Sequence, residues 1–271
     1  MPLSGVAEGS LTSLQKANKK TQSIMAKIAA GHRLNSAMDD AAGMAVSINL
    51  DAELRSLHQA GNNTVQAISV MRTAEGGMAT IGDSLMRMSE LSVMAGSSTY
   101  SDSQRAMIQT EIDGLSQQID QVAGGTEYNG RPLLDGSSGQ LTFQVGTGNT
   151  PADQIEFETP DLSAATLGID GGSVATPAAA GSLNDAVHAA MDTLHTMRAD
   201  VGAKMNVAET AANGLATAME NTAVSLSQIR DLDMASASTE KASGIIQLKM
   251  GIALTAQGSD IQSSLVEKLL G

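Results

Sequence analysis

The sequence predicts a mainly α-helical protein, a long antiparallel helical hairpin or bundle with coiled-coil pairing of its N- and C-terminal helices and one small β-hairpin. Three observations lead to this fold class. Hydrophobic residues make up 42% of the 271 residues but aromatics only 1%, which favours a thin aliphatic core. Apolar residues recur at three- and four-residue intervals over long stretches, the period of a helix. One stretch alone shows the alternation of strands.

The first helix is predicted from Leu11 to about Ala30. Its apolar face is formed by Leu11, Leu14, Ala17, Thr21, Ile24 and Ile28. Gly31 and the polar run 35–40 then interrupt the pattern, because Gly, Asn and Asp are poor residues for helix interiors. We expect residues 1–40 to be one part of a discontinuous domain that residues 235–271 complete.

The middle of the chain, residues 41–234, is predicted to be a helical bundle. Its first long helix reaches about Ala95 and carries a face formed by Met78, Ile81, Leu85 and Met88. Ser101 followed three residues later by Gln104 is a capping-box pattern, with apolar heptads behind it. Apolar residues alternate after that helix, at Leu141, Phe143, Val145, Ile155 and Phe157. This alternation predicts the β-hairpin near residues 140–158.

The second half begins with a stretch rich in Gly, Ala, Ser and Pro, residues 163–181, which we interpret as a linker. Ser182 with Asp185 is predicted to cap a return helix whose apolar stripe runs to Ile229 without Pro. A helix of that length with one apolar stripe needs a partner. Residues 235–271 combine crowded apolar side chains with internal glycines, so we expect them to be helical only when packed.

Charge, apolar stretches and cysteine content limit the partners and the location expected for the chain. The chain has 16 Lys plus Arg against 29 Asp plus Glu, a net charge of -13, which disfavours nucleic acid. No apolar stretch reaches the roughly 18 residues of a transmembrane helix, so no membrane insertion is expected. The N-terminus lacks the basic and apolar regions of a Sec signal peptide. The absence of Cys is compatible with the cytosol and with the exterior of a cell.

No pattern of residues predicts catalysis, a cofactor or a metal site. The four histidines, His32, His58, His188 and His195, are scattered. The run 146–148 begins like a dinucleotide loop, but Pro151 follows and no βαβ unit surrounds it. Adjacent Asp39 and Asp40 fit helix-end or interface roles better than acid–base chemistry. We therefore predict a non-catalytic, self-associating structural protein.

Several runs of residues, taken in order, resemble the bacterial flagellins. The run 30–43 is similar to the family's N-terminal signature, and 73–76 resembles its next marker. The run 127–136 is similar to the segment that enters the family's hairpin, while 191–203 and 229–235 resemble its C-terminal pattern. The matching signature and polymerisation positions are Arg33, Asn35, Ser36, Asp39, Asp40, Ile229, Asp231 and Asp233.

The resemblance implies a subunit that polymerises into the bacterial flagellar filament. In that family the N- and C-terminal helices pair in an inner tubular layer, and a helical bundle surrounds it. Larger flagellins insert outer domains between the two halves, and we expect none here because the predicted hairpin passes almost directly to the return helix. The resemblance also implies export of the unfolded chain by the flagellar type III apparatus and an extracellular location. Its implied partners are further copies, an export chaperone at the C-terminal segment, and filament cap and junction proteins.

The resemblance also implies recognition by the vertebrate innate receptor for flagellin. The recognition region maps onto residues 85–94 and the following helix, with Arg87, Leu91 and Glu111 at its key positions. Ser89 stands where receptor-active members often carry a second basic residue, a departure that weakens the expected recognition. The same residues fit an alternative role equally well, in which they serve only bundle packing and filament contacts.

Two alternatives remain at this point. A hook-filament junction protein shares the terminal architecture, but its members usually follow the paired Asp with Pro, whereas Ala41 follows Asp40 here. A helical signalling module would show unbroken heptads and no hairpin. Residues 1–9 lack the Asn-rich opening usual in flagellins. From the apolar patterns at both ends we predict that the termini pair with each other only in the assembled state.

Overall fold

The computed structural model describes residues 3–270, except the side chains of residues 3–8, 10, 262, 265, 266, 269 and 270. Of the atypical opening, residues 1–9, residues 1 and 2 lie outside the described residues, and of residues 3–8 only the backbone is described. The chain divides into two compact units. Unit 1 comprises Met1–Leu54 with Glu220–Gly271, and unit 2 comprises Arg55–Met219. The sequence-based divisions at residues 40 and 235 both fall inside unit 1.

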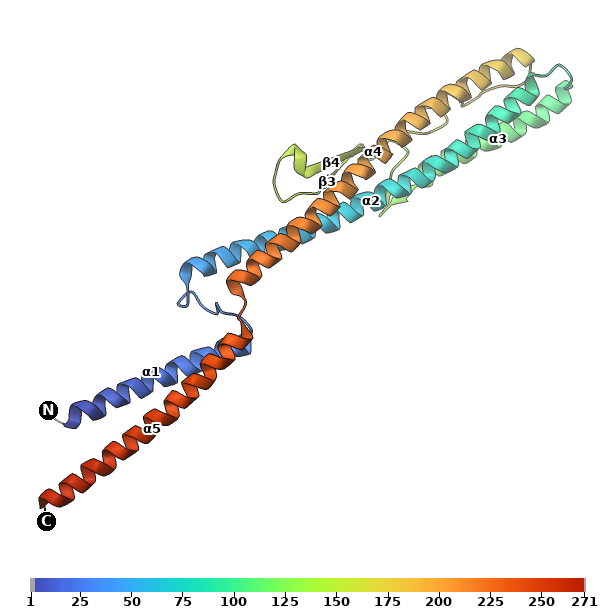
Figure 1. Cartoon of the computed structure of the whole chain (residues 1–271). Helices are drawn as coiled ribbons and strands as arrows, with labels where there is room; N and C mark the ends of the chain where they lie inside the picture. The colour runs from blue at the N-terminus through green and yellow to red at the C-terminus, as the bar shows by residue number, and fades with distance from the viewer. Residues whose placement is uncertain (1–2, 271) are drawn as a thin grey trace. The chain divides into compact units, whose positions relative to one another are not determined.

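Helices make up most of the described chain, which confirms the predicted fold class (Figure 1). The α-helices are α1 (Leu3–Ala30), α2 (Ala41–Gly96), α3 (Asp102–Gly125), α4 (Pro177–Arg230) and α5 (Met234–Leu270). The strands are β1 (Glu127–Tyr128), β2 (Arg131–Pro132), β3 (Gln140–Gln144) and β4 (Gln154–Glu158). A short 3-10 helix, Pro151–Asp153, precedes β4.

The predicted β-hairpin is confirmed as the antiparallel pair β3–β4. Leu141 lies opposite Phe157, and Phe143 lies opposite Ile155, so the alternating apolar residues share one face. A second pairing, β1–β2, was not predicted. It turns on Asn129 and Gly130, both at positive φ (52° and 73°), which is the conformation that an Asn-Gly hairpin turn requires. Each of its strands has only two residues, too few to show alternation.

The core of unit 2 lies between α2, α3, α4 and the β3–β4 hairpin. The predicted face of α2 is fully buried, with 0% exposure at Met78, Ile81, Leu85 and Met88. The capping box of α3 is also confirmed, since the Ser101 hydroxyl accepts the Gln104 amide and the Gln104 side chain accepts the Ser101 amide. The helix therefore begins where the sequence predicts.

The predicted start of the return helix was wrong. α4 begins at Pro177, and the Thr176 hydroxyl accepts the Ala179 amide at 3.2 Å. Ser182 lies inside the helix, where its hydroxyl donates to the Ala178 carbonyl. Proline fits the first helical position because its fixed φ suits the helix and its missing N–H would have no partner there. The Pro-Ala-Ala-Ala run is therefore the first turn of α4.

The stretch before α4 is also more than a linker. Residues 162–174 bury Leu162, Ala164, Ile169 and Val174 in the core of unit 2. Asp161 organises this stretch, because its two carboxylate oxygens accept the Ser163 amide and the Thr166 hydroxyl. Its small residues looked like a linker in sequence, yet they let the chain lie close against the helices.

Unit 1 contains the antiparallel pair α1–α5, whose helices lie side by side (Figure 1). Of the predicted apolar face of α1, Thr21 and Ile24 are buried, whereas Leu11 is 55% exposed and does not join the seam. Two glycines of α5 allow the close approach. A Cβ at Gly244 would lie 2.6 Å from the Thr21 hydroxyl, and one at Gly251 would lie 2.7 Å from Leu14 Cδ1.

Candidate functional site

The two halves of the chain meet in unit 1 at a junction formed by residues 31–40 and 229–233. Gly31 ends α1 with φ +73°, a left-handed conformation that glycine adopts readily. The Arg33 amide donates to the Arg230 carbonyl at 2.7 Å, and the Leu232 amide donates to the Gly31 carbonyl at 3.1 Å. The Arg33 guanidinium adds a 2.7 Å hydrogen bond to the Ile229 carbonyl. Arg33 therefore connects the two segments through both backbone and side chain.

Asp39 organises the loop between α1 and α2. Its Oδ2 accepts the amides of Asn35 and Ser36, each at 3.2 Å, and its Oδ1 lies 3.0 Å from Lys27 Nζ. The hydrogen bond from Lys27 holds the pKa of the Asp39 carboxyl below its usual value, and the Asn35 amide adds to this effect. The carboxylate thus links α1 to the loop that follows it.

Asp40 and Asp233 cap the helices on either side of the junction. Asp40 accepts the Gly43 amide at 3.0 Å, and a Cβ at Gly43 would lie only 2.5 Å from the same carboxylate. Asp233 accepts the amides of Ala235 and Ser236 at 2.9 and 3.1 Å. A carboxylate in this position satisfies free helix N–H groups and favours the helix dipole. These two residues therefore act at helix ends.

Asp231 completes the junction opposite His32. The two residues form an antiparallel bridge, with His32 Nδ1 3.3 Å from Asp231 Oδ1. Hydrogen bonds from Ser227 and Arg230 hold the pKa of Asp231 below its usual value, with attraction from Arg230 and His32 adding to this. The structure thus brings the N-terminal and C-terminal signature residues together in one place.

In unit 2, Arg87 and Glu111 are joined on the surface between α2 and α3. Arg87 donates from Nε and Nη2 to Glu111 Oε1 at 2.9 and 2.7 Å, and from Nη1 to Glu90 at 3.1 Å. The Glu111 hydrogen bonds raise the pKa of Arg87. Leu91 is only 1% exposed and packs in the core. It therefore supports this surface from below and offers no area for direct contact.

Two of the flagellin-like runs meet in unit 2 through an ion pair. Arg198 of α4 donates from Nε and Nη2 to Glu75 of α2, at 2.9 and 2.7 Å. Glu75 lies in the run 73–76, and Arg198 lies in the run 191–203. The pairing raises the pKa of Arg198. Two donors of one planar guanidinium converge on the single oxygen Oε1, a geometry that favours arginine over lysine at this position.

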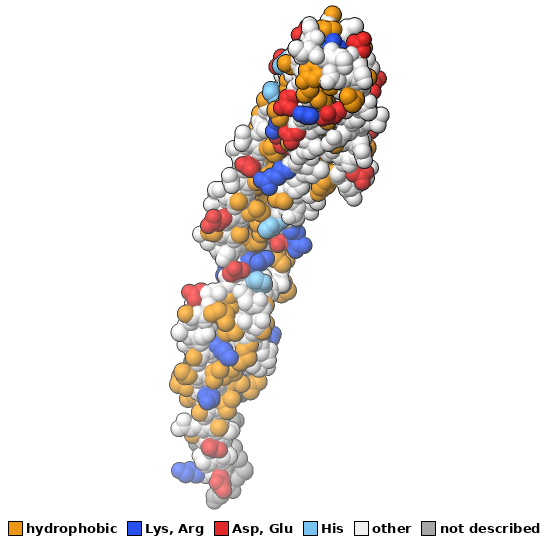
Figure 2. All heavy atoms as spheres, turned by 90° about the vertical axis from the view of Figure 1, so that its right-hand side faces the viewer, with side chains coloured by type: hydrophobic (Ala, Val, Ile, Leu, Met, Phe, Trp, Pro, Cys, Tyr) orange, Lys and Arg blue, Asp and Glu red, His pale blue; other side chains and the backbone are white. Residues whose placement is uncertain are grey.

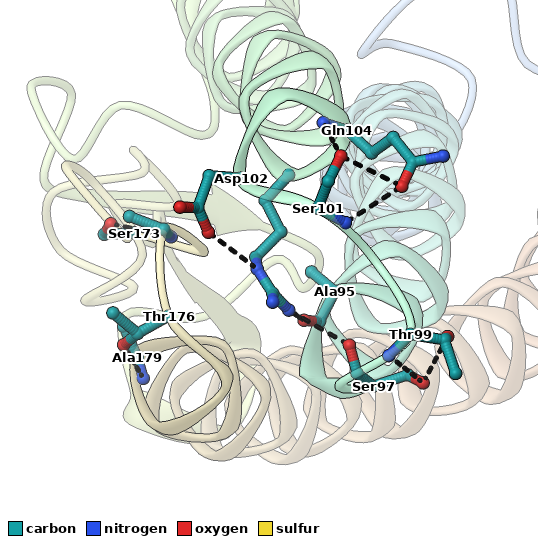
Figure 3. Close-up of polar contacts among 11 residues, drawn as sticks. Ala95, Ser97, Thr99, Ser101, Asp102, Gln104, Ser173, Thr176 and Ala179 are labelled. Atoms are coloured by element: carbon teal, nitrogen blue, oxygen red, sulfur yellow. Dashed lines mark hydrogen bonds and ion pairs between the residues drawn. The ribbon is translucent and has the colours of Figure 1, made fainter.

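Arg105 is a residue whose role sequence reasoning missed. Its side chain is 8% exposed, and Nη1 donates to the carbonyls of Ala95 at 2.8 Å and Ser97 at 3.0 Å (Figure 3). Asp102 Oδ1 lies 3.9 Å from its Nε. A cation there satisfies carbonyls that the end of α2 leaves free and so holds the turn into α3. The sequence carried only a weak signal for this role, namely a basic residue next to the capping box that begins at Ser101.

Among the described side chains, no group of three or more His, Asp or Glu is arranged to hold a metal ion. Within the same residues, no helix combines the length and apolar character needed to cross a membrane. The histidines His188 and His195 lie exposed on α4.

Comparison with known protein families gives two matches. Residues 5–139 match the bacterial flagellin N-terminal helical region, and residues 184–269 match the bacterial flagellin C-terminal helical region. A flagellar filament 30.7 kDa core protein of Treponema maltophilum is 32% identical over 89% of this chain and 90% of its own length. A flagellin of Bacillus subtilis is 32% identical over 97% of both chains.

Solved structures show the same fold. The crystal structure of Bacillus cereus flagellin aligns with a TM-score of 0.51 and 23% identity, covering 57% of this chain and 88% of that one. A putative flagellar hook-associated protein from Vibrio parahaemolyticus aligns with a TM-score of 0.60 and 14% identity, covering 71% of this chain and 100% of that one. At these identities both likenesses concern the fold alone. The matches at both ends of the sequence and the relatives across its length place this chain in the bacterial flagellin family, whose members are structural subunits of the flagellar filament.

Proposed function

We propose that this chain polymerises outside the cell into a flagellar filament, with the α1–α5 pair of unit 1 in its innermost layer. The observation that supports the proposal is the surface of that pair. On α5, five large apolar side chains are each at least 50% exposed: Ile246, Met250, Ile252, Leu254 and Ile261. Figure 2 shows hydrophobic side chains gathered along the part of the surface that α1 and α5 form.

Such a surface favours association with further copies. An exposed apolar patch of this kind is uncommon on monomeric proteins and marks interaction sites. Full burial of one large aliphatic side chain contributes about 1.5–3 kcal/mol, so covering half of each of these five residues contributes several kcal/mol per subunit. Contacts repeated along a polymer add to one another. A structural rather than catalytic role agrees with the family.

The first test is removal of the end of α5. We expect deletion of residues 261–271 to abolish filament formation, because it removes the exposed Ile261 and the last turns of α5. Purified protein seeded with filament fragments would be followed by sedimentation and negative-stain microscopy. Unit 2 should keep its helical circular dichroism and its unfolding midpoint. Long filaments from the shortened chain would contradict the assignment of this helix pair to assembly.

Export partners follow from the same apolar face. Our proposal includes export through the flagellar type III apparatus as an unfolded chain, without cleavage of a signal. An export chaperone would cover residues 235–271 until assembly, since α5 carries six of the twelve large apolar side chains that are exposed in the described part of unit 1. Cap and junction proteins at the filament ends complete the proposed set of partners.

Recognition by the host innate receptor is proposed for the surface that Arg87 and Glu111 share. We expect weakened recognition, because Ser89 is neutral and its hydroxyl is engaged by Asn184 at 2.9 Å. Arg87→Ala should reduce signalling in a receptor reporter cell severalfold. Arg72→Ala is the matched control, because Arg72 is 67% exposed and also forms a surface ion pair. Equal signalling by the wild type and Arg87→Ala would rule out a role for this surface.

A further inference from the structure

Helix α1 carries a stripe of lysines that has no counterpart elsewhere in unit 1. Lys16, Lys20 and Lys27 lie on one face at intervals of four and seven residues, with Lys19 beside them. Lys27 is paired with Asp39. The other three side chains are exposed, and none forms an ion pair with any residue that the structure describes. Three unpaired lysines close together are notable in a chain with a net charge of -13.

The register of the α1–α5 pair shows why a single copy leaves these lysines unpaired. Leu14 lies against Gly251, and Thr21 lies against Gly244. Because the helices are antiparallel, Lys16 is then level with Lys249. One copy therefore has a lysine, and no acidic residue, on α5 at the level of Lys16, so it offers this lysine no attractive partner there.

The acidic residues that would match the stripe lie further along α5. Asp260 and Glu267 are exposed, are seven residues apart on one face, and form no ion pair within the described residues. Measured along α5 from Lys249, Asp260 lies about 16 Å further on and Glu267 about 27 Å further on, at the usual rise of about 1.5 Å per residue. A lysine side chain cannot span either distance, so the pairing cannot form within one copy.

We propose that Lys16, Lys19 and Lys20 of one copy dock against Asp260 and Glu267 of a second copy displaced by about 25 Å along the helix pair. At this offset Lys16 is level with Glu267 and Lys20 with Asp260, each to within about 3 Å, which flexible lysines accommodate. The inference rests on the proposed filament function and assigns the charged contact that sets its register.

Charge and apolar area have separate roles in this docking. Ile261 is 50% exposed next to Asp260, and Leu254 is 63% exposed two turns earlier on the same helix. These side chains supply apolar contact area, while the charged pairs select one offset among the many that an apolar stripe alone would allow. A second copy fits the lysine stripe better than nucleic acid does, because the rest of the chain is acidic and would repel phosphate.

The absence of Cys in the chain permits a direct cross-linking test. Full-length Lys20→Cys/Asp260→Cys would be assembled from wild-type filament fragments as seeds and then oxidised, with the unassembled monomer oxidised in parallel. We expect a ladder of covalent multimers from the filament and unlinked chain from the monomer. Lys20→Cys/Ala253→Cys is the matched control, because Ala253 is exposed one heptad earlier, about 10 Å away. Equal ladders from both variants, or no ladder from the first, would overturn the inference.

Charge reversal gives a second, independent test. Lys16→Glu/Lys20→Glu and Asp260→Lys/Glu267→Lys should each lower the polymerisation rate at low salt about tenfold, and their combination should restore it. Arg72→Glu/Arg131→Glu, at two exposed arginines of unit 2, serves as the control of equal charge change and should polymerise faster than the first pair. Unchanged polymerisation in every variant would overturn the docking proposal alone. A wild-type chain that forms no filaments would overturn the proposed function as well.

Discussion

Single carboxylates at the junction of unit 1 illustrate what one residue contributes. Asp39 accepts two backbone amides and pairs with Lys27, so one side chain closes the loop between α1 and α2. Asp40 and Asp233 cap the helices that follow. The role of Asp39 depends on ionisation, because a carboxylate accepts charge-assisted hydrogen bonds that a protonated acid does not.

The lowered pKa of Asp39 predicts an acid-sensitive loop. Its pKa is lower in the folded chain than the unfolded value of about 3.9, so its stabilisation is fully present above about pH 4. The stabilisation is lost as the pH falls through the folded pKa. We expect the amide chemical shifts of Asn35 and Ser36 to change together in that range, measured by NMR on the monomer. Asp39→Asn should show altered shifts at neutral pH and no such step.

Glu53→Gln is the control for this titration, since Glu53 is exposed in the same unit. It should leave the acid step of Asn35 and Ser36 unchanged. A step of the same size in Asp39→Asn would show that another group controls the loop.

At the scale of elements, the α1–α5 pair depends on two glycines a heptad apart. Gly244 and Gly251 face Thr21 and Leu14 so closely that a side chain would meet them. Glycine costs about 1 kcal/mol of helix propensity relative to alanine, so its presence on the seam reflects close packing rather than helix formation. Gly258, one heptad further, has open space around it.

This contrast predicts opposite outcomes for two similar substitutions. Gly251→Val should separate α1 from α5 and reduce filament yield at least severalfold, because the new side chain would overlap Leu14. Gly258→Val places the same residue where nothing lies within 4 Å and should retain filaments. Sedimentation of seeded protein measures both. A wild-type yield of filaments from Gly251→Val would contradict the close packing of Gly251 against Leu14.

At the scale of the whole molecule, the two units differ in their reliance on a partner. Unit 2 encloses a continuous core from α2, α3, α4 and β3–β4. In unit 1 the α1–α5 pair is two helices thick and leaves large apolar side chains exposed along α5. Two isolated helices bury too little area to offset their conformational entropy comfortably. Their stability should therefore depend on neighbouring copies.

Limited proteolysis tests this dependence. In the monomer we expect residues 1–40 and 235–271 to be cleaved well before the middle of the chain, and in the filament we expect all three to resist. Mass spectrometry of the fragments over time gives the order of cleavage. A monomer that protected its ends as well as its middle would disprove the prediction that the termini pair only in the assembled state.

The sequence alone predicted the elements whose signal is local. The apolar face of α2, the capping box at Ser101 and the β3–β4 pairing were all recognised, because helix and strand periods are visible in adjacent residues. The order of the flagellin-like runs along the sequence also indicated the flagellin family. The sequence misplaced the start of α4, because Ser182 with Asp185 resembles a cap as well as Thr176 does.

Tertiary structure decided the features that depend on residues distant in sequence. The resemblance to the flagellins implied that Leu91 belongs to a recognition surface, whereas packing buries it. Arg105 lies within an ordinary helical pattern, and only the approach of the end of α2 shows what it binds. The register of Leu14 on Gly251, which leaves the lysines of α1 unpaired, likewise follows from two helices meeting across more than two hundred residues. Periodicity tells which face of a helix is buried, but the partner and the register are set by the contacts that the folded chain brings together.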